Sequence, residues 1–218
     1  MMMVWQIWNV RNAWVFERKA IDPKVACDRA LKILGDYEMA MVRESAPAPT
    51  CEVVQRALFP STIAPFKLNT DAAVREGECG LGMVVRDGVG DVVMAAGERR
   101  KGCWSAAQGE AEAFKFGLQY AYDGGFRCIE AETDCQKVID MLVKGTRERS
   151  SIQVVVDDIL ALARNFVSCS FYFARRSCNR VAHAIAQTSL NLCEVKVWME
   201  DHPIEVTSIV EADKAFIT

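Results

Sequence analysis

The alternation of apolar and polar residues between positions 66 and 98 predicts β-strands. The segment FKLNTDAAV (66–74) is typical of a strand that ends in an acidic residue. The segment GLGMVVRDGVGDVVMAAGE (80–98) contains two apolar runs around the turn signals Asp87-Gly88 and Gly90-Asp91, which predicts a hairpin. We therefore expect three antiparallel strands at the start of a domain.

Beyond residue 104 the apolar positions recur with the period of a helix. Ser105 and Gln108 have the spacing of a capping box, and Gly124-Gly125 is expected to end the helix. The apolar residues of this helix follow one another at steps of four and three, at Ala107, Ala111, Phe114, Leu118 and Ala121. The later elements expected from the same reasoning are a strand at 128–133, a helix around 138–142 that stops at Gly145, a helix from Ser150 or Ser151 to Phe166, a strand at 168–174 and a helix at 179–192.

This order of elements predicts an α/β fold. Three early antiparallel strands, followed by two strands that alternate with helices, favour a mixed five-stranded sheet with helices on both faces.

Residues 1–64 follow a different pattern. Positions 4–43 keep rough helical spacing, and SAPAPT (45–50) is typical of a linker. We expect an N-terminal helical appendage and Pro/Ala linker over 1–64, a main domain over 65–195 and a C-terminal tail over 196–218. The opening MMMVWQIWNVRNAWVF is too short and too often interrupted by polar residues for a membrane span, and it lacks the pattern of a signal peptide.

Composition narrows the class of protein. With 218 residues, 51% of them hydrophobic, the chain can bury one full core and carry an appendage. A net charge of -3 excludes a global polycation, so any binding of nucleic acid must use local basic patches. The nine cysteines are scattered without a C-x-x-C pair, which favours reduced thiols in an intracellular protein.

Three acidic residues fall at corresponding places in the predicted elements. Asp71 is expected at the end of the first strand, Glu110 in the first turn of the first helix, and Asp134 directly after the fourth strand. If the first and fourth strands are neighbours, these carboxylates converge on one edge of the sheet. Converging carboxylates suit two Mg²⁺ (or Mn²⁺) ions, which could act on a phosphodiester. Spacing alone leaves open separate, solvated carboxylates.

Segments along most of the chain resemble a known family. The segments are KLNTDAAV, GLGMVVRDGVGDVV, EAEAFKFGLQYAYDGGFRCIEAETDCQKVID and RRSCNRVAHAIAQ. Together they resemble the ribonuclease H-like domain found in plant genomes at the end of non-LTR retroelement reading frames and as separate genes. The tail VWMEDHPIEVTSIVEAD and the early segment IWNVRNAWVF are similar to the flanking parts of that group.

The resemblance implies a role for each matching residue. Asp71 matches the first metal-bridging aspartate, Glu110 the helix glutamate and Asp134 the third carboxylate, while Glu112 is a near alternative to Glu110. Gln136 matches a glutamine that contacts the minor groove of the hybrid, where 2′-hydroxyls identify RNA. An ordinary exposed helix residue is the other interpretation of Gln136.

His183 stands where the fuller family pattern has a fourth aspartate. A neutral imidazole can ligate a metal, and it titrates near neutral pH, so His183 could assist catalysis by proton transfer. The alternative is a histidine with only a packing role on a helix.

A basic surface is the last feature that the resemblance leads us to expect. The chain has no lysine-rich insertion, so contacts to phosphates would rest on Arg86, Arg99, Arg100, Lys101, Arg175, Arg176 and Arg180. Each of these could equally be a solvated charge.

The sequence thus supports two main hypotheses. The first is a Mg²⁺- or Mn²⁺-dependent endonuclease that cuts the RNA strand of an RNA–DNA hybrid. The second is a catalytically weak or inactive domesticated module that binds nucleic acid or a protein partner, the latter through the Trp-rich N-terminal helix. A fragment of a larger polyprotein is a third alternative.

Overall fold

The computed structural model describes residues 22, 24–25, 66–102, 104–147 and 150–215. The chain divides into two compact units, Met1–Ala48 and Pro49–Thr218, and every strand and helix discussed below belongs to the second. The expected N-terminal helical appendage, and with it the Trp-rich segment considered for a protein partner, lies outside the described residues.

The described elements follow the predicted order and then add a strand and a helix. They are β1 (Phe66–Arg75), β2 (Glu78–Arg86), β3 (Val92–Lys101), α3 (Ala106–Asp123), β4 (Cys128–Thr133), α4 (Gln136–Val143), α5 (Ser151–Ala163), β5 (Ser168–Phe173), α6 (Arg180–Ser189), β6 (Lys196–Met199) and α7 (Thr207–Ala215). Short 3-10 turns precede α6 and α7, at Arg176–Cys178 and Ile204–Val206.

The sheet has six strands in the order β5-β4-β1-β2-β3-β6, so the expectation of five strands is wrong. The extra strand, β6, is antiparallel to β3 through the pairs Met94↔Met199 to Gly97↔Lys196. Its four residues are too few to produce a recognisable alternation. The pairing of β1 with β4 is parallel, which confirms that the first and fourth strands are neighbours.

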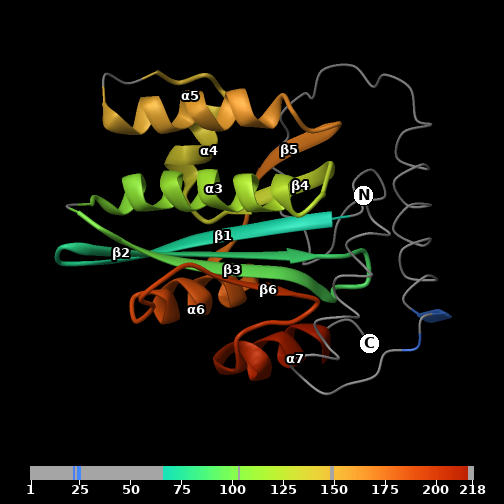
Figure 1. The fold of residues 1–218 in the computed structure, drawn as a ribbon. Coiled ribbons are helices and arrows are strands. Elements are labelled where there is room, and N and C mark those ends of the chain that lie inside the picture. The colour runs from blue at the N-terminus through green and yellow to red at the C-terminus, as the bar shows by residue number, and fades with distance from the viewer. Residues whose placement is uncertain (1–21, 23, 26–65, 103, 148–149, 216–218) are drawn as a thin grey trace. The chain divides into compact units, whose positions relative to one another are not determined.

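Helices cover both faces of the sheet, as expected. Figure 1 shows α3, α4 and α5 on one face and α6 and α7 on the other. Buried apolar side chains fill the space between the sheet and the helices, among them Leu68, Leu81, Phe114, Leu118 and Ile129. Residues of the C-terminal part join this packing, because Val206 and Val210 lie in one apolar cluster with Val84, Val181 and Ile185.

The local signals at the ends of α3 act as predicted. The Ser105 hydroxyl accepts the backbone N–H of Gln108, and the Gln108 side chain accepts the backbone N–H of Ser105. At the other end Gly124 caps the helix and Gly125 has a φ of 92°, a conformation that favours glycine. These caps fix where α3 begins, and therefore where along the sheet Glu110 lies.

Helix α6 lies unusually close to the sheet because glycines form the surface beneath it. A Cβ atom at Gly82 would come within 2.5 Å of the Ala182 carbonyl oxygen, and one at Gly80 would be 3.0 Å from the Leu190 nitrogen. Gly82 is paired with both Asp71 of β1 and Gly97 of β3. Helix α6 therefore approaches the backbone of the sheet closely next to Asp71.

No helix in the described ranges is long and apolar enough to cross a membrane.

Candidate metal centre

Asp71 lies within β1, not at its end as the sequence suggested. It is the sixth residue of the strand and is paired with Gly82. β1 remains paired with β2 as far as Arg75, but its parallel pairing with β4 stops at Asn69↔Glu132. Asp71 therefore lies just beyond the last residue of β1 that pairs with β4, with only 3% of its surface exposed.

Asp134 and Glu110 approach the same point from two other elements. Asp134 follows the last residue of β4, as predicted. Glu110 is the fifth residue of α3 and thus lies in the second helical turn, whereas the first turn was predicted. The helix begins after Ser105 as predicted, so the difference lies only in the turn that reaches the end of β4, where Glu110 contacts Thr133.

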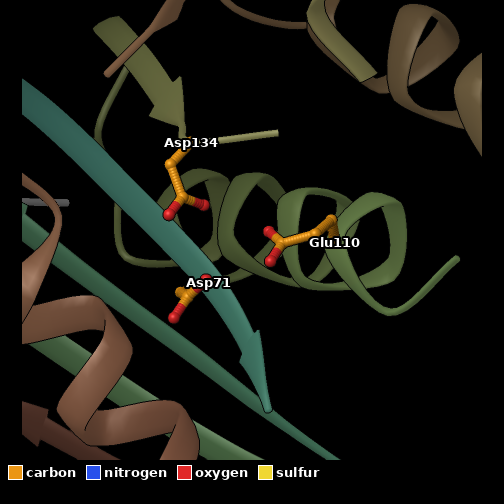
Figure 2. Close-up of side chains that lie close together, drawn as sticks. All are labelled: Asp71, Glu110 and Asp134. Atoms are coloured by element: carbon orange, nitrogen blue, oxygen red, sulfur yellow. The ribbon is translucent and has the colours of Figure 1, made fainter. Parts of the chain in front are cut away.

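The three carboxylates form one cluster. One oxygen from each of Asp71, Glu110 and Asp134 lies within 4.8 Å of the others. Figure 2 shows the three carboxyl groups facing a common point between the strands and the helix. Glu112, the near alternative, is occupied elsewhere, because its Oε2 accepts a hydrogen bond of 2.6 Å from Arg100.

Charge repulsion and burial shift the protonation of this cluster. Burial, followed by the negative charge of Asp71, raises the pKa of Glu110 to about 9. The pKa of Asp134 is also raised, again by burial and then by Asp71, although the charge of Arg176 opposes the shift. Without a cation, the site thus favours a protonated Glu110 near neutral pH.

His183 contacts the cluster from the opposite face of the sheet. Its Nδ1 lies 2.5 Å from Oδ2 of Asp71, and about a third of its side chain, 34%, is exposed. The position in α6 follows from the glycines described above, which let the helix approach β1 and β2. His183 therefore contacts the cluster through Asp71.

Most of the arginines expected on a basic surface have acidic partners. Arg99 pairs with Glu78 at 3.4 Å, and Arg100 bonds both Glu98, at 2.8 Å, and Glu112. Lys101, Arg175, Arg176 and Arg180 are exposed, although Arg180 lies 3.9 Å from Asp213. Gln136 is exposed at the first turn of α4, where its amide donates to Asp140.

Arg86 is buried and so does not contribute to that surface. Its Nη1 donates to Asn69 at 3.0 Å and its Nη2 to Asp213 of α7 at 3.1 Å. Asn69 in turn donates to Glu132 at 2.9 Å, and Lys67 pairs with the other oxygen of Glu132 at 2.8 Å. We call these five residues the buried ion network. Sequence reasoning missed it because its members are far apart in the chain.

Two further residues beside the site were not identified from the sequence. The Thr133 hydroxyl contacts Glu110, and Asn179 donates from Nδ2 to the Thr70 carbonyl, next to Asp71. The adjacency of Thr133 to Asp134 was the only available signal.

Comparison with known proteins agrees with this architecture. Residues 69–189 match the reverse transcriptase-like family. The ribonuclease H1 of Halobacterium salinarum NRC-1 is 25% identical, with a TM-score of 0.55 over 58% of this chain and 97% of that protein. The N-terminal ribonuclease H domain of a Mycobacterium tuberculosis protein has 18% identity and a TM-score of 0.54, covering 59% of this chain and 94% of that one.

A third similar structure is LC11 ribonuclease H1 in complex with an RNA/DNA hybrid. It is 16% identical, with a TM-score of 0.53 over 58% of this chain and 96% of that one. No curated protein matches the chain significantly in sequence.

Proposed function

Because this chain belongs to the reverse transcriptase-like family and has a ribonuclease H-like fold, we propose that it is a metal-dependent endonuclease that hydrolyses the RNA strand of RNA–DNA hybrids. The observation that carries the proposal is the cluster of Asp71, Glu110 and Asp134, whose oxygens lie within 4.8 Å of one another. Mutually repelling, partly buried carboxylates do not stabilise a fold, so their convergence favours a ligand-binding role.

Mg²⁺ or Mn²⁺ suits this donor set. All three side chains offer carboxylate oxygens, the ligands that these hard cations prefer. The raised pKa of Glu110, caused by burial and by Asp71, indicates an excess of negative charge that a divalent cation would compensate. We expect Asp71, Glu110 and Asp134 to hold two such ions.

In the proposed reaction the three carboxylates would hold the metal ions, and His183 would assist proton transfer. When bound, the ions would stabilise charge on the phosphodiester and favour attack by water. His183 donates from Nδ1 to the Asp71 carboxylate, which fixes the orientation of the ring. Its Nε2, when protonated, would then be the nitrogen that gives a proton to the leaving oxygen of the cut strand, and it would take a proton back from water.

An RNA–DNA hybrid is the substrate that the surroundings of the cluster favour. One of the similar structures contains such a hybrid. Gln136 is exposed two residues after Asp134, where an amide can bond a 2′-hydroxyl across the wide minor groove. The exposed side chains of Lys101, Arg175 and Arg176 could contact phosphates.

A second candidate, a binding module with little or no catalysis, is favoured by the partners of the site residues. Asp71 is already bonded to His183 at 2.5 Å, so the ring competes with a cation for that oxygen. Arg86, Arg99 and Arg100 are paired with acids, which leaves a smaller basic surface than the sequence suggested.

The test is cleavage of an end-labelled RNA–DNA hybrid in Mg²⁺ and in Mn²⁺. We expect the wild type to cut the RNA strand, and Asp71→Asn or Glu110→Gln to lose activity by at least about 100-fold, since even residues that only support a metal ligand are worth 10–100-fold. Glu112→Gln is the matched control, because this glutamate is on the same helix but bonds Arg100.

The outcomes separate the two candidates. Activity that survives Asp71→Asn would contradict a nuclease centred on this cluster. An inactive wild type that gains activity with His183→Asp would indicate a site weakened at one position. Hybrid binding without cleavage in every variant would support the binding module.

A further inference from the structure

Thr133, the last residue of β4, connects two parts of the carboxylate cluster. Its side chain is completely buried, with 0% of the residue exposed. Its Oγ1 lies 3.2 Å from Oε2 of Glu110, and it also accepts the backbone N–H of Cys135 at 3.2 Å. The hydroxyl therefore lies between the helix that carries Glu110 and the turn that carries Asp134.

The N–H of Cys135 fixes the direction of one of these hydrogen bonds, which leaves the hydroxyl proton of Thr133 for the other. The N–H of Cys135 can only donate, so Oγ1 acts as its acceptor. A threonine hydroxyl has a single proton, and the Glu110 carboxyl oxygen is the acceptor within reach. Thr133 thus donates a hydrogen bond to Oε2 of Glu110.

Glu110 needs such a contact more than the other two acids do. Asp71 is held within a strand, and Asp134 directly follows one, and these two strands are paired in parallel register. Glu110 extends from a helix on a longer side chain with more rotatable bonds, whose freedom must be lost when the carboxylate is fixed. The negative charge of Asp71 also repels the ionised form of Glu110, the form that would bind a metal.

We propose that Thr133 is a positioning residue that holds the Glu110 carboxylate in the cluster, against its mobility and against repulsion by Asp71. At the same time its bond to Cys135 fixes the turn that orients Asp134. The consequence for metal binding rests on the proposed function, whereas the placement of Glu110 does not.

The chain offers matched variants for the test. Thr133→Val removes the hydroxyl but keeps the branched shape, and Thr133→Ser keeps the hydroxyl. Thr70→Val is the control, because Thr70 is equally buried at 0% on the neighbouring strand and its hydroxyl bonds the Glu132 carbonyl at 3.5 Å, not a carboxylate of the cluster.

Two measurements are needed, on the full chain. Titration calorimetry with Mn²⁺ should show about 10- to 100-fold weaker binding for Thr133→Val, as for other residues that orient metal ligands. Thr133→Ser and Thr70→Val should bind like the wild type. In the metal-free protein, the ¹³C resonance of the Glu110 carboxyl should move in Thr133→Val and stay in place in the other two variants.

The proposal would be overturned by Thr133→Val with wild-type Mn²⁺ affinity and an unmoved carboxyl resonance. It would also be overturned by Thr70→Val with losses as large as those of Thr133→Val, which would reveal a general packing effect. If the wild type binds no Mn²⁺, the proposed function fails, and the Glu110 resonance alone decides whether Thr133 positions that carboxyl.

Discussion

Glu110 and Glu132 belong to two different groups of charged side chains in the same sheet-and-helix layers. Glu132, 4% exposed, has Lys67 at 2.8 Å and Asn69 at 2.9 Å. Glu110 faces Asp71 and Asp134 and receives one hydrogen bond from Thr133. Burial raises the pKa of both, but Lys67 opposes the shift at Glu132, whereas Asp71 adds to the shift at Glu110.

The difference separates a structural use of buried charge from a functional one. In the buried ion network each carboxylate has a cationic partner, so the charges are compensated within the chain. In the carboxylate cluster Arg176 opposes only part of the pKa shift at Asp134, so a bound cation or a proton must supply the remaining compensation. A fold can tolerate the second arrangement only because well-compensated regions stabilise it elsewhere.

The largest effect is expected from breaking the buried ion network. Glu132→Gln keeps the shape of the side chain but removes the negative charge that lies 2.8 Å from the buried Lys67 ammonium. Removing one partner of a buried ion pair costs about 3–5 kcal/mol of unfolding free energy. Urea denaturation with linear extrapolation would measure the loss, and an unchanged midpoint would mean that Lys67 is stabilised by other groups.

At the carboxylate cluster, in the absence of metal, we expect negative charge to lower the stability of the fold, whereas in the buried ion network the charged carboxylate stabilises it. The folded state keeps a proton on Glu110 up to a pKa of about 9, while the unfolded state releases it near 4.5. The stability of the metal-free protein should therefore fall as the pH rises through this window, by at most about 1.4 kcal/mol per pH unit.

Glu110→Gln should flatten this pH dependence, because the amide does not titrate. Saturating Mn²⁺ should flatten it in the wild type, because the cation favours the ionised carboxylate. Thermal unfolding at several pH values would test both expectations. An equal slope in the wild type and in Glu110→Gln would show that the cluster does not repel as its geometry indicates.

The smallest effect on stability is expected at an exposed ion pair, with which the buried ion network and the carboxylate cluster can both be compared. Lys115 and Asp158 join α3 and α5, with side chains that are 40% and 50% exposed. Asp158→Asn should change the unfolding free energy by about 1 kcal/mol or less, because water already solvates both charges. A loss comparable to that of Glu132→Gln would remove the distinction between buried and exposed pairs in this protein.

Local sequence signals account for most of the fold. The capping box at Ser105 and the glycines at 124 and 125 determine where α3 begins and ends, and the strand at 128–133 is found at those bounds. Long-range pairing could not be predicted in the same way. Arg86 and Asp213 are separated by 127 positions, so nothing near Arg86 indicated that this cation is buried against α7.

The candidate site shows the same division. The three acids converge as expected because β1 and β4 are neighbours. Two of them lie at other positions along their elements than predicted, since Asp71 lies in mid-strand and Glu110 in the second turn of α3. The position of Asp71 within its strand depends on how far β1 continues beside β2, which is a property of the pairing and not of either segment alone.

The glycines beneath α6 determine where position 183 lies, but they do not determine which side chain stands there. A backbone-to-backbone approach, such as that of Ala182 to Gly82, is independent of which side chain stands one residue later in the helix. The residue at 183 can therefore be exchanged without moving the Cα from which it reaches Asp71. The backbone therefore fixes position 183 beside the cluster, and histidine is one of several side chains that this position can accommodate.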